Sequence, residues 1–477
     1  MSFESSARRW PVEPQAVKTQ EGAPHTERAS NNSKLRWVLT LENPTLIGAP
    51  PTLGGSAATH RLLGTVHNLT MLAATRRSCL AITSGSPSLA RALAGASGGA
   101  LRRTPLWESH VALGGKMVEF GGWDMPVQYP DGIVKSHEHT RAAAGLFDVS
   151  HMLGCVVRGA DRVAFMEKLC TADIKALPDG MGSLTVITNE DGGVIDDCII
   201  TNAGDHLYMV INAGHEEIDL PHIKKHMDAF VAAGGDVSFE TLPDNGILAL
   251  QGPKAASVLQ KLVSEDLSQM GFMYAKPMTV AGIEGCFVAR SGYTGEDGFE
   301  IAVPKGSTPK HGVVTLWETL LGDADVMPVG LGARDSLWLE AGLCLYGNDL
   351  DTTTSPAEGT LFWVVAKSRR VPGSFVGSER ILEEIANKSA KRKRAGFVIT
   401  GAPARQGTAI MNAEGEEIGV VTSGGHSPIL KKGIGMCYVK PEYNKAGTEL
   451  FVMLRKKKQT ITITKMPFVP QNYYRGP

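Results

Sequence analysis

Residues 188–197 read Thr-Asn-Glu-Asp-Gly-Gly-Val-Ile-Asp-Asp, a turn sequence followed by an apolar pair and two adjacent carboxylates. Asn, Asp and Gly favour tight turns, and the apolar, β-branched runs at 183–188 and 198–201 on either side predict strands. Successive side chains of a strand point to opposite faces. We therefore expect one of Asp196 and Asp197 to face solvent and the other to face a pocket or the core.

Outward from this stretch, the chain from Leu106 onward alternates between strand-like and helix-like runs. Apolar residues at helical spacing predict helices over 161–170, 216–233 and 253–262, and short apolar runs predict strands at 206–211 and 247–250. The basic, polar run 387–394 is expected to be a domain boundary. After it the pattern predicts only strands, which favours a small barrel or sandwich, at 396–400, 417–422, 433–439, 449–454 and 460–464.

Composition limits the class of protein. The chain has 477 residues, 43% hydrophobic and 20% charged, which is enough for two or three globular domains. A formal net charge of -1 and the lack of a long apolar run favour neither nucleic-acid nor membrane partners. The seven cysteines show no metal or disulfide spacing, and no Walker loop or strand-linked dinucleotide fingerprint is found.

The first hundred residues have the composition of a leader. No Asp or Glu occurs between Glu42 and Glu108, while Ser, Thr, Ala, Gly and Arg are frequent. An acid-poor, Arg-bearing leader is typical of an organelle transit peptide, and the stretch that best fits this pattern begins at Met71. We expect residues 1–100 to be a disordered leader with a true start at Met71; a poorly packing tail without targeting function is the alternative.

Six unusual runs occur in one order along the chain, and together they resemble the aminomethyltransferase (T-protein) family of the glycine cleavage system from Leu101 to the C-terminus. The resemblance implies an α+β, three-domain folate-binding fold. Two interlaced α+β units would surround a central cavity in residues 101–386, and a C-terminal β-barrel would occupy 387–477. The six runs are Phe120–Tyr129, Leu146–Met152, Thr188–Asp197, Ser291–Glu300, Gly332–Asp349 and Lys465–Tyr474.

The resemblance also implies an activity in the mitochondrial matrix. The enzyme would move the methylene carbon of an aminomethyl group from the lipoyl arm of the H-protein to tetrahydrofolate, releasing ammonia, with the P- and L-proteins as further members of the system. Tetrahydrofolate would be a substrate, and no metal, flavin or nicotinamide is expected. Two rivals are a folate-binding accessory protein for iron–sulfur assembly, whose cysteine signature is not found, and the folate domain of a demethylating flavoenzyme.

Two carboxylates carry the expected chemistry. From the residues alone Asp197 could simply cap its turn, but it matches the family's catalytic aspartate, which would stabilise the cationic aminomethyl carbon. Glu300 matches the family's pterin-anchoring glutamate, and a salt bridge to a core arginine is its alternative. The Gly-Glu-Asp-Gly turn before it is expected to leave Glu296 and Asp297 solvated.

Other positions match ligand contacts of the family. Folate is flat and amphipathic, so aromatic and soft apolar walls are expected around it, although each such residue could instead belong to the core. The arginine at 334 would meet a folate carboxylate, with an ion pair to Asp335 as the alternative, and the asparagine at 212 could instead be a turn residue. The matched positions are Met152, Tyr208, Asn212, Tyr293, Arg334, Trp363 and Tyr473.

Two positions depart from the family pattern. Trp338 stands where relatives usually carry a basic residue, and Ser368 interrupts a basic run. We expect these changes to affect ion pairing or partner contact rather than chemistry.

Overall fold

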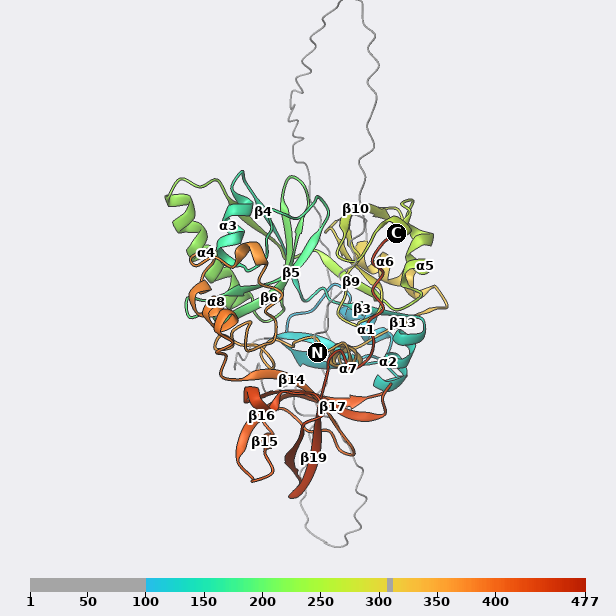
Figure 1. Cartoon of the computed structure of the whole chain (residues 1–477). Coiled ribbons are helices and arrows are strands. Elements are labelled where there is room, and N and C mark those ends of the chain that lie inside the picture. The colour runs from blue at the N-terminus through green and yellow to red at the C-terminus, as the bar shows by residue number, and fades with distance from the viewer. Residues whose placement is uncertain (1–99, 307–311) are drawn as a thin grey trace, which may run out of the picture. The chain divides into compact units, whose positions relative to one another are not determined.

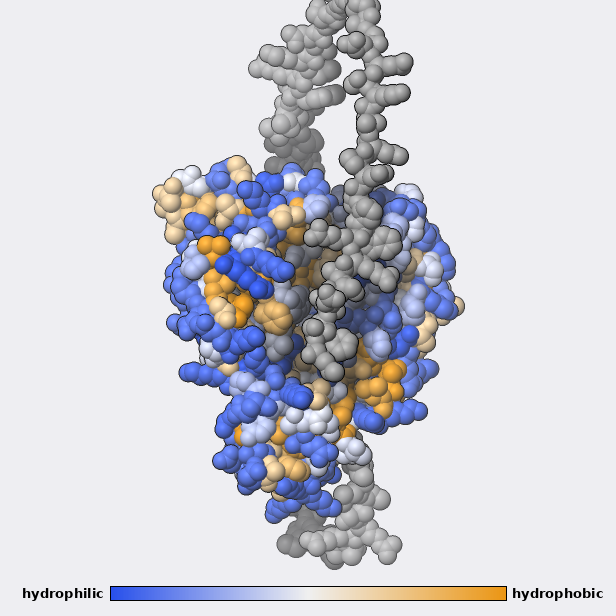
Figure 2. Space-filling model, in the orientation of Figure 1, coloured by the Kyte–Doolittle hydropathy of each residue, from blue (hydrophilic) through white to orange (hydrophobic). Residues whose placement is uncertain are grey.

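The computed structural model describes residues 100–306 and 312–477 (Figure 1). The leader predicted for residues 1–100, with its Met71 start, therefore lies outside the described residues except for its last position. No helix in the described part is both long enough and apolar enough to cross a membrane. Figure 2 shows hydrophilic residues over most of the visible face, with separate apolar areas between them.

The first sheet has six strands in the order β10-β11-β12-β9-β3-β13. All neighbours run antiparallel except β13, which pairs in parallel with β3. Its buried face packs against helices α5 and α6 in one apolar core. The strands are β3 Ala144–Asp148, β9 Gly246–Gln251, β10 Ala275–Val280, β11 Ile283–Ala289, β12 Gly298–Val303 and β13 Val326–Pro328.

The second sheet has five strands in the order β5-β6-β7-β4-β8 and is made entirely by the chain between β3 and β9. The first sheet is therefore interrupted after β3 and resumes only when the second is complete. This threading confirms the interlaced α+β units. The strands are β4 Leu153–Arg158, β5 Gly182–Thr188, β6 Val194–Asn202, β7 Leu207–Ile211 and β8 Ser238–Leu242.

Eight α-helices and a short hairpin accompany these sheets in the described residues. Helices α3 and α4 share an apolar core with the second sheet, and α2 packs on α7. The hairpin pairs β1 Lys116–Phe120 with β2 Trp123–Gln128. The helices are α1 Trp107–Ala112, α2 Gly132–Ala142, α3 Arg162–Leu169, α4 Glu216–Ala232, α5 Ala255–Leu259, α6 Gly312–Leu321, α7 Leu331–Glu340 and α8 Ser378–Asn387.

The C-terminal part is a closed barrel, which decides between the barrel and the sandwich left open by the sequence. Along β19, Ile461 and Ile463 point inward and are buried, because side chains alternate along a strand. The strand at 409–411 has three residues and was not predicted. The strands are β14 Lys393–Ile399, β15 Ala409–Met411, β16 Glu417–Ser427, β17 Lys432–Val439, β18 Glu449–Leu454 and β19 Lys457–Thr464.

One fully buried carboxylate at the end of α7 joins the barrel to the α+β units. Glu340 accepts hydrogen bonds from Arg141 Nη2 (2.9 Å) of α2 and from Ser427 Oγ (2.5 Å) of the barrel. His137 Nε2 of α2 lies 3.0 Å from the same side chain. Helix α7 also contacts β2, β16 and β17, and Figure 1 shows it beside β17. The position of α7 therefore depends on both parts of the chain.

We predict that Glu340→Ala lowers the free energy of unfolding by about 3–5 kcal/mol, because it leaves buried polar partners unpaired. Urea unfolding followed by circular dichroism measures the change. Glu417→Ala, an exposed barrel position, serves as control and is expected to stay within about 0.5 kcal/mol. Equal unfolding midpoints for the two variants would contradict this role of Glu340.

Candidate active site

A small cavity of about 70 Å³ lies next to Asp197. It is formed where β1, the β3–β4 connection, β6, the β7–α4 connection and α7 meet the loop that follows α7. Its volume is smaller than a pterin ring needs, so side chains must move when such a ligand binds. The lining residues are Phe120, His151, Met152, Asp197, Asn212, Ala213, His215, Arg334, Asp335, Trp338, Leu345, Tyr346, Gly347 and Asn348.

The turn before Asp197 has the geometry that its sequence predicts. Asn189 Oδ1 accepts hydrogen bonds from the backbone N–H of Asp191 (3.0 Å) and of Gly193 (2.8 Å). A Cβ at Gly193 would lie 1.8 Å from the carbonyl oxygen of Thr352, so only glycine fits there. The turn feeds directly into β6, which starts at Val194, four residues before the predicted strand.

Asp197 is half-buried and lines the cavity. Burial and the neighbouring charge of Asp196 raise its pKa to about 8, because both disfavour the ionised form. Its backbone carbonyl accepts a hydrogen bond from Asn212 Nδ2 at 3.0 Å. Asp197 is therefore a carboxyl group whose charge depends on what binds beside it.

The expectation that one of the two aspartates faces solvent was wrong. Asp196 is 1% exposed, because β6 is an inner strand of its sheet and α4 packs against it. Its Oδ1 accepts a hydrogen bond from Asn212 Nδ2 at 2.9 Å. The opposite faces of the strand are thus a buried core and a cavity.

Arg334 projects from α7 and is 7% exposed. Its guanidinium lies 3.0 Å (Nη1) from His151 Nε2, and 4.9 Å and 5.4 Å from the ring centres of Tyr293 and Trp338. Burial and the Arg334 charge lower the pKa of His151 to about 3, so the imidazole is neutral.

The sequence left open an ion pair between Arg334 and Asp335, and this ion pair is not present. No carboxylate in residues 100–306 and 312–477 lies within ion-pair distance of the Arg334 guanidinium. Burial raises the pKa of Asp335 to about 7 despite the adjacent Arg334 charge. A buried cation without an anion partner is costly, and a ligand carboxylate would relieve that cost.

Glu300 lies on β12 and is partly buried. Ser291 Oγ donates a hydrogen bond to its Oε2 at 3.1 Å, and burial raises its pKa, with the Ser291 hydrogen bond and the charge of Arg334 opposing that rise. The core salt bridge considered as its alternative is not seen among the described residues, so the second carboxylate oxygen is available to a ligand.

Three of the predicted ligand-contacting side chains pack on one apolar cluster. Met152, Tyr208 and Tyr293 all contact this cluster, which lies between the first sheet and α7. Tyr293 also stacks on Trp338, with ring centres 5.3 Å apart and planes 24° apart. Met152 and Trp338 line the cavity, whereas Tyr208 and Tyr293 do not.

Five predicted positions do not line the cavity: Tyr208, Tyr293, Glu300, Trp363 and Tyr473. Trp363 lies between α7 and α8 and is 57% exposed, and it does not line the cavity. Tyr473 stacks on Phe272 with ring centres 4.1 Å apart. The C-terminal segment does fold back over the Ser291–Glu300 run, since Asn472 N–H donates to the Gly295 carbonyl at 2.7 Å.

The expectation that Glu296 and Asp297 are solvated was wrong. Glu296 is 3% exposed and pairs with Arg141 at 2.8 Å, while Asp297 pairs with Arg290 at 2.6 Å. The turn is present, but arginines from other parts of the chain bury its carboxylates.

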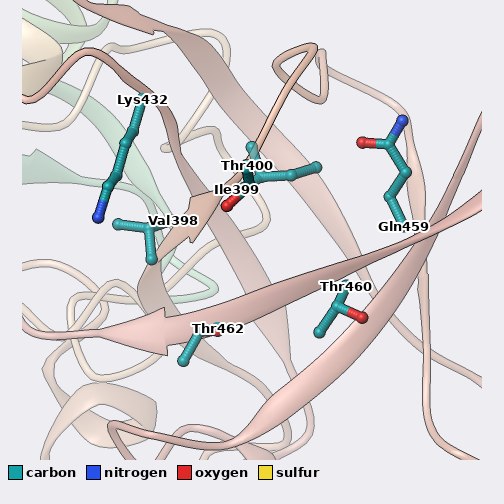
Figure 3. A pocket seen from close by; sticks show the side chains of 7 residues that line it. All are labelled: Val398, Ile399, Thr400, Lys432, Gln459, Thr460 and Thr462. Atoms are coloured by element: carbon teal, nitrogen blue, oxygen red, sulfur yellow. The ribbon is translucent and has the colours of Figure 1, made fainter.

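A second, larger hollow of about 430 Å³ lies on the barrel (Figure 3). In this view Lys432 and Gln459 lie on opposite sides, with Ile399 and Thr400 between them and Thr460 and Thr462 below. It contains no carboxylate and none of the predicted ligand residues. We therefore place the chemistry at the smaller cavity, where the titratable side chains converge.

Comparison with known proteins matches this architecture. Residues 106–369 match the GCVT N-terminal domain family, and residues 392–470 match the glycine cleavage T-protein C-terminal barrel domain. The mitochondrial aminomethyltransferase of Flaveria trinervia is 51% identical over 79% of this chain and 91% of its own length. That of Homo sapiens is 49% identical over 81% of this chain and 94% of its own.

A solved structure agrees with these sequence matches. Glycine cleavage system aminomethyltransferase T from Bartonella henselae superposes with a TM-score of 0.73 at 40% identity, covering 79% of this chain and all of that one. The chain belongs to the glycine cleavage aminomethyltransferase (T-protein) family. Membership makes it a transferase that acts with tetrahydrofolate.

Several cavity residues of this T-protein family member were not found from the sequence. His151 and Asp335 each adjoin a residue that was assigned, Met152 and Arg334, so the quoted runs contained the signal. Trp338 was noted only as a departure from the family pattern. Its indole fills part of the cavity and donates a hydrogen bond from Nε1 to the Cys344 carbonyl at 3.0 Å.

Among the described residues, one group of buried side chains has the spacing to hold a metal ion. The potential ligand atoms of Asp196, His215 and Asp219 lie within 4.8 Å of one another. The two carboxyl groups are both buried, so a proton shared between them accounts for the same geometry without a metal.

We predict that Arg334→Met raises the Kd for tetrahydrofolate at least tenfold, because it removes the guanidinium that would meet a ligand carboxylate. The same change is expected to leave stability equal or higher, since a buried unpaired charge disappears. Fluorescence titration and thermal unfolding measure the two effects. Arg455→Met, at an exposed barrel turn, is the control; a parallel loss of folding in Arg334→Met would instead make the arginine structural.

Proposed function

We propose that this chain transfers the methylene carbon of an S-aminomethyl-dihydrolipoyl group, carried by the H-protein, to tetrahydrofolate in the mitochondrial matrix. The observation that carries the proposal is the half-buried Asp197 carboxyl group in a cavity that also holds the unpaired guanidinium of Arg334. The relatives named mitochondrial aminomethyltransferase support the reaction and the compartment. The P- and L-proteins would be the other members of the same system.

The reaction balances without any redox partner. Two bonds form, from the methylene carbon to two folate nitrogens, and the bonds from that carbon to the amino group and to sulfur break. The two folate N–H protons leave with the products, which are ammonia, 5,10-methylene-tetrahydrofolate and the dihydrolipoyl H-protein.

Asp197 would supply the negative charge that this reaction needs. Positive charge develops on the methylene carbon as its bond to the leaving group breaks, and a carboxylate in a water-poor cavity stabilises it strongly. The cation itself favours ionisation of Asp197, whose pKa is about 8 without it. No covalent intermediate on the protein is required.

The remaining assigned residues would bind the folate. Glu300 has one oxygen held by Ser291, which leaves the other to accept a donor of the pterin ring. Asn212 holds the strand of Asp197, and Met152, Tyr208 and Tyr293 form the apolar wall. Five of the assigned residues lie outside the lining of the cavity, so as ligand contacts they stay predictions that require the ligand to extend beyond it: Tyr208, Tyr293, Glu300, Trp363 and Tyr473.

The direct test is formation of methylene-tetrahydrofolate from aminomethylated H-protein. We predict that Asp197→Asn lowers kcat by about 10²–10³-fold, because the charge is lost while the shape is kept. Asp205→Asn, at an exposed turn, is the matched control and should retain the wild-type rate. Folate binding without turnover by the wild type would favour the non-catalytic accessory protein; equal rates for both variants would remove Asp197 from the mechanism.

The raised pKa of Asp197 gives the reaction a defined pH dependence. The carboxyl group is protonated below its pKa of about 8 and ionised above it. We therefore expect log kcat/KM to rise by about one unit per pH unit below that value and to level off above it. Stopped-flow rates from pH 6 to 9 measure the limb, and a limb that falls with increasing pH would contradict an ionised Asp197.

A further inference from the structure

A second pair of carboxyl groups lies directly behind Asp197, on the other face of β6. Asp219 of α4 is 1% exposed, and neither of its oxygens has a donor partner among the described residues. A carboxylate oxygen of Asp196 lies within 4.8 Å of one of the Asp219 oxygens. A buried carboxylate without donors is costly, so this pair needs a positive charge or a proton.

The surroundings supply no positive charge. No Lys or Arg in the described part of the chain lies within ion-pair distance of Asp196, Asp197 or Asp219. His215 Nδ1 is 3.9 Å from Asp196 Oδ1, too far for a hydrogen bond, and burial lowers the pKa of this imidazole. The titratable groups facing the pair are Asp197 and Cys198 from β6, Cys155 from β4, His215 from the start of α4, and Tyr346 from the loop after α7.

A shared proton satisfies the pair. A carboxylate only accepts hydrogen bonds, so a bond between two carboxyl groups requires that one of them carry the proton. Two carboxyl groups in one site then hold a single negative charge, as like charges cannot both ionise there. In agreement, burial and the mutual charge raise the pKa of Asp196, and burial raises that of Asp219 to about 7.

The pair is connected to Asp197 through one asparagine. Asn212 Nδ2 donates both to Asp196 Oδ1 (2.9 Å) and to the backbone carbonyl of Asp197 (3.0 Å). The Asn212 N–H also points to Asp196 Oδ2 at 3.4 Å. The orientation of Asp196 therefore sets the position of the main chain at Asp197.

We propose that Asp196 and Asp219 are positioning residues, a carboxyl pair that shares one proton and, through Asn212, holds Asp197 facing the cavity. The proton also keeps the charge behind Asp197 at one unit, which allows Asp197 to ionise during the reaction. This role rests on the proposed function of Asp197.

Matched substitutions of Asp219 test the proposal. Asn has the same shape and donates a hydrogen bond as the protonated acid does, whereas Leu has similar size and donates none. We expect Asp219→Asn to keep kcat within about threefold of wild type, with the same pH limb. Asp219→Leu is expected to lower kcat at least tenfold with a displaced limb, because Asp196 loses its donor. Equal activity of the two variants, high or low, would overturn the proposal.

A second measurement does not depend on turnover and so separates this inference from the proposed function. In the folded wild type the pKa of Asp219 is about 7 and that of Asp196 is also raised, whereas in the unfolded chain both groups lose their protons near the ordinary pKa of 3.8. The wild type therefore loses stability relative to Asp219→Asn as pH rises from 5 to 8. Urea midpoints that stay parallel over this range would overturn the shared proton.

The same samples test a bound cation as the rival explanation. Titration of wild type with Mg²⁺, Mn²⁺ or Zn²⁺ alone is expected to leave the urea midpoint unchanged, as is added EDTA. A cation-dependent midpoint that disappears in Asp219→Asn would assign the site to a metal and overturn the proposal.

Discussion

The burial of Glu340 between α2 and the barrel is the constraint on which the arrangement of the site depends. This one carboxylate accepts hydrogen bonds from Arg141 on one side and from Ser427 on the other. It fixes the C-terminal end of α7, and six residues earlier the same helix presents Arg334 to the cavity. The barrel thus takes part in the site indirectly, by setting the axis of the helix that carries the guanidinium of Arg334.

The cavity itself combines groups that are each unfavourable in the free protein. Asp197 and Asp335 have raised pKa values because burial disfavours their ionised forms, and Arg334 is buried without a carboxylate partner. Such groups reduce stability until a ligand of opposite charge binds. A substrate with a carboxylate and a developing positive charge would relieve both, so the same electrostatics favour binding and chemistry.

Local patterns predicted the secondary structure well where elements were long and periodic. Helix α4 and the barrel strands β16 and β18 begin at the predicted residues, while β15 is too short to show a pattern. Asp197 and Arg334, which were assigned because their runs match the family pattern, line one cavity, and their roles stay predictions. Contacts distant in sequence could not be predicted: Glu296 is buried by Arg141, 155 residues away, and nothing in the 361–366 stretch indicates that Trp363 lies at the surface.

The threading of the two sheets has a consequence for how the chain folds. The neighbours of β3 in its sheet are β9 and β13, which follow it in the sequence by about a hundred residues or more. When β3 leaves the ribosome these two strands have not yet been synthesised, so both edges of β3 stay unpaired while the whole second sheet forms. Such long-range pairing is intrinsically slow and leaves edges open to wrong partners. Cutting the chain between β8 and β9 leaves the second sheet with all its strands but separates β3 from β9 and β13, so neither piece contains the complete first sheet.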